Sequence, residues 1–161
     1  MKKWRRLSAA GIYLAAAAFL LLPLASCKIP EASPGTARVS RVIDGDTIEL
    51  ASGEHVRYIG IDTPELSPLE PYGREAKEAN RELVEGKIVR LEIDTSETDR
   101  YDRLLRYVWV DDKMANLELV RLGLAEAKTY PPDTRYQVIL EAAETEAKLA
   151  GRGMWEDAIS K

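Results

Sequence analysis

Short apolar runs separated by turn-forming residues predict five strands in this chain. Each run is rich in Val, Ile and Leu and is bounded by Gly, Asp, Ser or Glu, which is the pattern of successive strands joined by tight connections. A charged turn at residues 94–102 separates the last two runs. The expected strands cover residues 37–43, 47–50, 55–61, 87–93 and 104–110.

Three other segments have the spacing of amphipathic helices. Residues 73–84 are rich in Glu, Lys, Arg and Ala, and Gly86 is placed to end that helix. A short helix follows, with Asn116 as its expected N-cap and Gly123 as its C-terminal cap. The last helix opens after Pro131-Pro132-Asp133 and ends at Gly151. The apolar residues that these helices are expected to carry are Ala76, Ala79, Leu83, Leu117, Val120, Leu122, Tyr136, Leu140, Ala143 and Ala147.

Five strands and three helices in this order predict a small α+β domain. The order suits a five-stranded OB-type β-barrel with three helices. The pattern alone also leaves other small α+β folds open.

The first 26 residues have a different character from the rest. Four basic residues precede an apolar segment at residues 7–22, which is the pattern of an export signal. Leu24-Ala25-Ser26-Cys27 also resembles a bacterial lipobox, which implies cleavage before Cys27 and lipidation of this single cysteine. The alternative is an uncleaved helix that spans the bilayer. We expect a lipoprotein signal peptide at 1–26, a tether at 27–36, and an OB-fold domain at 37–161 held at the cell membrane or surface.

The net charge excludes one class of nucleic-acid binder. The chain has 23 basic and 27 acidic residues, and removal of residues 1–26 takes away four basic and no acidic residues, which leaves a formal charge of −8. A protein that holds DNA by counterion release alone is expected to be basic overall. Any contact with nucleic acid is therefore expected to be local and assisted by a metal.

Two adjacent strand-and-turn segments carry the candidate chemistry. Asp44-Gly45-Asp46-Thr47 and the stretch from Arg57 to Glu65 bring carboxylates and an arginine together, and residues 99–103 add a second arginine. Hard cations take carboxylate and carbonyl oxygens, and an arginine fork matches the oxygens of a phosphodiester. The only histidine, His55, lies in or after a turn, so a histidine-centred triad or a multi-histidine zinc site is not expected.

Together these segments resemble the staphylococcal-nuclease-like (thermonuclease) family. Its signature is a D-G-D-T strand, an R-x-x-x-x-D-T-P-E strand end and a later Y-x-R, and the resemblance extends from about Ala37 to Trp155. It implies an OB-type barrel and a calcium-dependent nuclease that hydrolyses DNA and RNA to 3′-phosphorylated products. We expect such a protein to act as a monomer.

The resemblance also implies roles for individual residues. Asp46, Asp62 and the backbone carbonyl of Thr63 would hold a calcium ion, with Asp44 orienting bound water. Glu65 would act as the general base. Arg57 and Arg103 would neutralise charge on the transition state. The expected nucleotide contacts are Tyr101 and Tyr130.

One position departs from the family pattern. The family commonly has glycine before the second arginine, whereas this chain has Asp102 between Tyr101 and Arg103. An aspartate can occupy a left-handed turn, and we expect its carboxylate to pair with Arg103 in the free protein and to repel an incoming phosphate. The alternative is that Asp102 points to solvent or adds an oxygen ligand near the calcium. Two other functions remain open: a non-catalytic OB-fold lipoprotein that binds nucleic acid or another anionic ligand, and a calcium-binding lipoprotein with a structural role.

Overall fold

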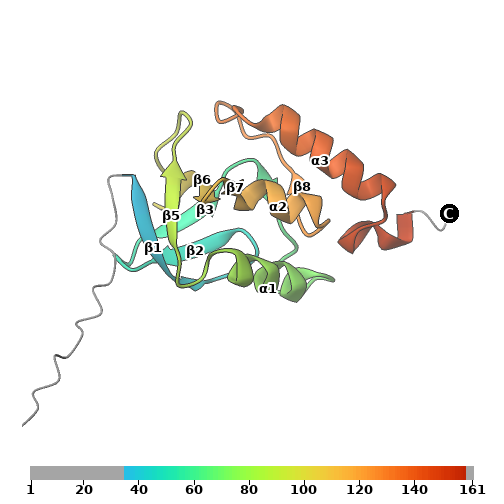
Figure 1. Cartoon of the computed structure of the whole chain (residues 1–161), viewed down its shortest axis with the longest axis horizontal. Coiled ribbons are helices and arrows are strands. Elements are labelled where there is room, and N and C mark those ends of the chain that lie inside the picture. Colours follow the sequence, from blue (N-terminus) through green and yellow to red (C-terminus); the bar gives the residue numbers. More distant parts are fainter. Residues whose placement is uncertain (1–34, 159–161) are drawn as a thin grey trace, which may run out of the picture. The chain divides into compact units, whose positions relative to one another are not determined.

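Five strands of the computed structural model, which describes residues 35–158, close into a barrel (Figure 1). The strands are β1 (Thr36–Val42), β2 (Thr47–Leu50), β3 (His55–Tyr58), β5 (Ile88–Glu92) and β6 (Leu104–Val110). They are hydrogen-bonded in the order β3-β2-β1-β5-β6, and a parallel pairing of β3 with β6 closes the ring. The predicted OB-type barrel is therefore confirmed.

The barrel is filled by the alternate side chains of its strands. Successive residues of a strand point to opposite faces, so Val56 and Tyr58 of β3 enter the core while Arg57 between them points away. The core is completed by side chains from all five strands and the helices, including Val39, Ile48, Leu50, Val89, Val108, Leu119, Val120 and Leu140. The strand period thus places Arg57 on the outer side of a rigid, buried strand.

Three helices lie against one another and the barrel. They are α1 (Gly73–Val84), α2 (Ala115–Arg121) and α3 (Gln137–Leu149), and α2 contacts β6, α1 and α3 (Figure 1). All three predicted helices exist, and the glycines expected to end them, Gly86, Gly123 and Gly151, follow them with positive φ angles.

Two details of the second helix were predicted wrongly. Asn116 is not an N-cap, because α2 starts at Ala115 and Asn116 is a fully buried residue within it. Its side chain instead accepts a hydrogen bond from the Val108 amide and donates one to the Ile59 carbonyl. Leu122 was expected within the helix, but α2 ends at Arg121; Leu122 is 47% exposed, and Leu119 packs in the core.

The predicted strand at residues 55–61 is broken at Gly60. Gly60 adopts φ 79°, a left-handed conformation that favours glycine, so β3 ends at Tyr58 and a new strand, β4 (Ile61–Asp62), leaves in another direction. β4 pairs with β8 (Glu126–Ala127), and the chain also contains β7 (Lys113–Met114) and a 3₁₀ helix, η1 (Gly153–Ala158). These short elements have too few residues for a periodic sequence pattern. The break carries Asp62 out of the barrel wall.

The predicted leader and lipidation site at Cys27 lie outside the described residues. β1 begins at Thr36, one residue before the expected start of the first strand. None of the helices in residues 35–158 has the length and apolar character needed to span a bilayer.

Candidate active site

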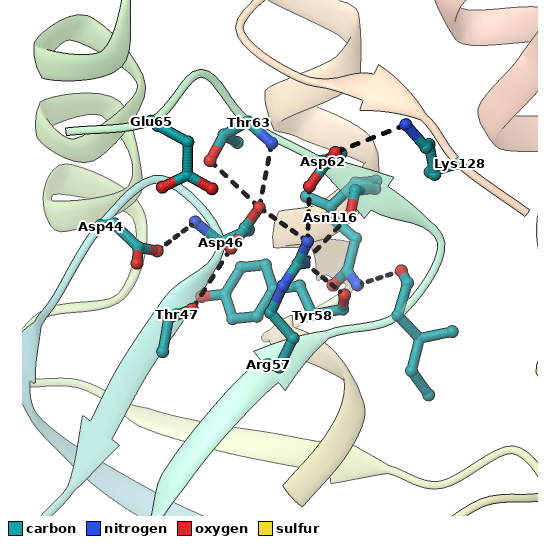
Figure 2. Close-up of polar contacts among 12 residues, drawn as sticks. Asp44, Asp46, Thr47, Arg57, Tyr58, Asp62, Thr63, Glu65, Asn116 and Lys128 are labelled. Carbon is teal, nitrogen blue, oxygen red and sulfur yellow. Dashed lines mark hydrogen bonds and ion pairs between the residues drawn. The ribbon is translucent and has the colours of Figure 1, made fainter. Parts of the chain in front are cut away.

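Arg57 connects the two acidic segments that the sequence singled out. Its Nη2 atom lies 2.8 Å from Asp62 Oδ1 and 3.1 Å from Asp46 Oδ2 (Figure 2). Its Nη1 atom donates hydrogen bonds to the carbonyl oxygens of Tyr58 (2.9 Å) and Ile61 (3.0 Å). Only 13% of the side chain is exposed. The guanidinium is therefore held in one orientation by four oxygens, in a geometry that a lysine cannot reproduce.

Asp46 is the most buried carboxylate of the site. Its Oδ2 atom accepts hydrogen bonds from the amide and the hydroxyl of Thr63, at 2.9 and 3.1 Å, and its Oδ1 atom accepts one from Thr47. Burial is the largest influence on its pKa and the nearby charge of Asp44 adds to it, so the pKa rises to about 6 despite the opposing effects of Arg57 and Thr63. The site thus contains a buried carboxylate that a further cation would stabilise in its charged form.

The glycine of the Asp-Gly-Asp turn is required by packing. A Cβ atom at Gly45 would lie 2.5 Å from the Thr63 hydroxyl oxygen and 2.7 Å from its Cβ. A larger residue would push Thr63 away from Asp46. The two predicted metal-binding segments therefore meet because the turn has no side chain at Gly45.

Asp62 lies at the rim of the site and has two cationic neighbours. Besides Arg57 on Oδ1, the ammonium group of Lys128 lies 3.6 Å from its Oδ2 atom (Figure 2). Its side chain is 39% exposed. Asp62 and Asp46 contact the same guanidinium group, so the structure places the two carboxylates together, as predicted. Each carboxylate oxygen of Asp62 faces a positive charge.

The donor chemistry of the site fits a hard cation. Asp44, Asp46, Asp62 and Glu65 offer carboxylate oxygens, and Thr63 offers a backbone carbonyl. Among the described residues, however, no three Asp, Glu, His or Cys side chains stand close enough to form a preformed cation cage. A metal at this place would need water and backbone oxygens to complete its coordination.

Glu65 is exposed and lies on the same side of the site as Asp44 and Asp46, as Figure 2 shows. Its backbone is anchored, because its amide donates to Glu70 Oε2 (2.9 Å) and its carbonyl accepts from the Glu70 amide (2.9 Å). An anchored backbone with an exposed carboxylate suits a group that must receive a proton from water.

The second predicted arginine, Arg103, pairs with Asp99. Its Nε and Nη2 atoms lie 2.8 and 2.7 Å from Asp99 Oδ2, and its Nη1 atom lies 3.5 Å from the Thr47 hydroxyl. Asp102 occupies the expected left-handed turn, with φ 60°. The expectation that Asp102 pairs with Arg103 is wrong, because the turn brings Asp99 to the guanidinium instead.

The arginines and the predicted aromatic contacts line one pocket of about 470 Å³. Arg57 and Arg103 form part of its wall, and Tyr101 and Tyr130 are 63% and 47% exposed there. The guanidinium groups of Arg100 and Arg103 lie 4.7 and 5.5 Å from the centre of the Tyr101 ring. Positive charge beside exposed aromatic rings is the combination that binds single-stranded nucleic acid.

Sequence reasoning missed several residues that position this site. Asn80 of α1 accepts a hydrogen bond from the Tyr58 hydroxyl (2.8 Å) and donates one to the Asp44 carbonyl (3.2 Å). Asp99 and Lys128 each pair with a predicted site residue. The sequence contained one signal for Asn80: it is a polar residue next to the apolar positions of α1. A buried amide side chain needs polar partners, so this position indicated a hydrogen-bonded contact.

Comparison with known proteins identifies the family of this chain. The family described as "Staphylococcal nuclease homologue" matches residues 55–157. The chain belongs to this family. The thermonuclease of Staphylococcus intermedius is 43% identical over 125 residues, which cover 73% of this chain and 74% of that protein. The thermonuclease of Staphylococcus hyicus is 37% identical over 163 residues, covering 91% of this chain and 96% of that protein.

A protein from another genus has a similar identity to this chain. Endonuclease YncB of Bacillus subtilis (strain 168) is 40% identical over 126 residues, which cover 73% of this chain and 60% of that protein. Within this staphylococcal nuclease homologue, the family match includes Arg57, Asp62, Glu65 and Arg103. Asp46 lies before the matched residues, and its link to them is the contact with Arg57 and Thr63.

Proposed function

We propose that this chain is a calcium-dependent phosphodiesterase that hydrolyses DNA and RNA to 3′-phosphorylated products. The observation that carries the proposal is the position of Arg57, which contacts Asp46 and Asp62 and also lines the pocket of Arg103 and Tyr101. One side chain thereby joins a site with hard-cation donors to a site for phosphate and bases. The names of the similar proteins, thermonuclease and endonuclease, support the coarser part of the proposal, that the chain is a nuclease.

The pocket binds the nucleotide and orients its phosphate. Tyr101 and Tyr130 offer ring faces on which a base can stack, which suits single-stranded or locally melted substrates. The guanidinium groups of Arg57 and Arg103 bring positive charge to the phosphate oxygens, which stabilises the negative charge that grows during attack.

Glu65 accepts a proton from the attacking water. The oxygen of that water forms a bond to phosphorus while the bond from phosphorus to the 5′ oxygen breaks. The 5′ oxygen takes up a proton from solvent, and the phosphate stays on the 3′ side. Asp99 holds Arg103 and Tyr58 helps to hold Arg57, so both guanidinium groups are oriented before the substrate arrives.

Asp46, Asp62 and the Thr63 carbonyl would hold the calcium ion, with Asp44 beside them. The ion would supply positive charge that stabilises the phosphate and lowers the pKa of bound water. We also propose that the protein is exported and anchored through a lipid on Cys27, which rests on the sequence pattern alone.

The test is cleavage of a single-stranded DNA oligonucleotide and of an RNA by the purified full chain, with calcium or with a calcium chelator. Cleavage that requires calcium and leaves 3′-phosphate ends supports the proposal. Binding without cleavage in saturating calcium contradicts it and favours an OB-fold module that only binds nucleic acid.

A further inference from the structure

Lys128 stands in the candidate site without a role in the mechanism described above. Its ammonium group lies 3.6 Å from Asp62 Oδ2, on the side of the carboxylate away from Arg57 (Figure 2). This contact is not a chance meeting of flexible side chains, because the backbone under it is fixed. The Lys128 amide donates a 2.9 Å hydrogen bond to the Gly60 carbonyl, and β8 before it pairs with β4, which carries Asp62.

Along the chain, Lys128 stands between residues that line two different pockets. Two residues after it comes Tyr130, which lines the large pocket together with three arginines, Arg57, Arg100 and Arg103, and two aspartates, Asp99 and Asp133. Two residues before it comes Glu126, which lines a pocket of about 150 Å³. The residues that line this small pocket, as far as the chain is described, are Asp62, Thr63, Pro64, Glu70, Glu126 and Met154, and none of them is basic.

A polyanion that leaves the large pocket past Asp62 therefore meets an acidic surface. A phosphate in that position would be repelled by Asp62 and Glu126. Lys128 is 47% exposed and lies beside Asp62, which lines the small pocket, so its ammonium group can reach solvent and a phosphate oxygen while its backbone stays fixed.

We propose that Lys128 is a third cation of the phosphate-binding surface, which pairs with Asp62 in the metal-free protein and contacts the phosphate next to the scissile one when Asp62 binds a cation. This inference rests on the proposed function and adds a positioning residue to it. Two positive groups, Lys128 and the metal, compete for Asp62. Release of Lys128 by the metal makes its charge available to the substrate at the moment when the site becomes active.

The competition predicts opposite effects on the two ligands. In Lys128→Gln, calcium should bind more tightly, by about threefold to tenfold, because a positive charge within a few ångströms of the ion is removed and only partly screened. Single-stranded DNA should bind more weakly, and the slope of log affinity against log salt should fall by about 0.7, the contribution of one phosphate contact. KM should rise more than kcat changes, since Lys128 does not touch the reacting atoms.

The experiment compares Lys128→Gln, Lys128→Arg and Lys113→Gln in the full chain. Lys113 is an exposed lysine on β7 at the other end of β6 from Arg103, so its variant removes the same charge far from the site. Calcium affinity is measured by calorimetry without substrate. The salt slope is measured with a single-stranded oligonucleotide at saturating calcium in a Glu65→Gln background, so that the oligonucleotide is not cut.

Tighter calcium binding and a lower salt slope in Lys128→Gln, with wild-type values in Lys113→Gln and a retained slope in Lys128→Arg, support the proposal. Tighter calcium binding with an unchanged slope overturns it, because Lys128 would then be only a counter-ion of Asp62. Equal behaviour of the two glutamine variants overturns it as well. In both cases calcium-dependent cleavage by the wild type leaves the proposed function standing, whereas a wild type that neither binds calcium nor cleaves contradicts both.

Discussion

Asp99 holds the guanidinium of Arg103 through two contacts to one carboxylate oxygen, 2.8 Å from Nε and 2.7 Å from Nη2. The other oxygen of Asp99 accepts hydrogen bonds from the backbone amides of Tyr101 and Arg103. Burial would raise the pKa of Asp99, but the hydrogen bonds from Tyr101 and Arg103 outweigh it and keep the pKa below its usual value. One carboxylate therefore fixes both the turn and the arginine that the turn presents.

Replacement of Asp99 by alanine should disorder this arrangement. We expect a loss of about 1–3 kcal/mol in stability, because two amides and a guanidinium lose their acceptor. We also expect a fall of about tenfold in kcat/KM, since Arg103 must be ordered at each turnover. Thermal unfolding and steady-state cleavage measure the two effects. Asp112→Ala, at an exposed position in the turn between β6 and β7, is the control; an Asp99→Ala enzyme as active as this control would show that Arg103 needs no support.

Glu65→Gln tests the proposed general base. The side chain is exposed and its anchoring contacts involve the backbone, so the fold and stability should be unchanged. The value of kcat should fall by about 10²–10⁴, the usual cost of removing a general base. Glu70→Gln is less suitable as a control because Glu70 holds the Glu65 amide, whereas exposed Glu75 of α1 is suitable. Turnover within a few-fold of wild type would exclude Glu65 as the base.

Much of the fold was predictable because its signals are local. The apolar runs of the barrel strands and the spacing in α1 gave elements close to those observed, and α1 has the predicted bounds, Gly73–Val84. The break at Gly60 and the pairing of β4 with β8 were not predictable. Their pairs join residues far apart in the sequence, and two-residue strands have no periodicity.

The candidate site was also predictable only in part: its motif residues were found from the sequence, and their long-range partners were not. The motif residues Asp46, Arg57, Asp62 and Thr63 meet as the signature implied. Their partners were missed, because a contact such as that of Lys128 with Asp62 depends on tertiary pairing. Proximity in sequence was also misleading, since Arg103 pairs with Asp99 four residues away rather than with its neighbour Asp102.

Asp133 should make stability depend on pH on the acid side. Burial raises its pKa, but hydrogen bonds from Ser96 and from the Thr95 amide outweigh this and lower it. A carboxyl group with a lowered pKa in the folded state stabilises the fold above its unfolded pKa, about 3.9, and this contribution is lost as pH falls through the folded pKa. Asp133→Asn should therefore flatten the fall in melting temperature below about pH 4. An unchanged acid slope would contradict this role.

Cys27 should carry a lipid, as the sequence pattern predicts. Replacement by alanine should alter processing and membrane retention without changing cleavage by the domain, because the candidate site lies within residues 44–130. Incorporation of labelled fatty acid into the wild type and the variant measures this. Absence of label from the wild type would contradict lipidation and favour an uncleaved apolar helix.

Arg57→Lys tests whether the geometry of the central cation matters or only its charge. A lysine ammonium cannot contact Asp46, Asp62 and the Ile61 carbonyl from one fixed orientation, so at least one buried acceptor would lose its partner. We expect stability to fall by about 1–3 kcal/mol and kcat by about 10²–10³, the cost of removing one transition-state donor. Arg90→Lys is the matched control, because Arg90 lies on β5 and stacks on Trp109 away from the site. Turnover is measured at saturating calcium, and a near wild-type value in Arg57→Lys would remove Arg57 from the mechanism. A loss of turnover in Arg57→Lys but not in Arg90→Lys would assign the effect to the guanidinium geometry of Arg57.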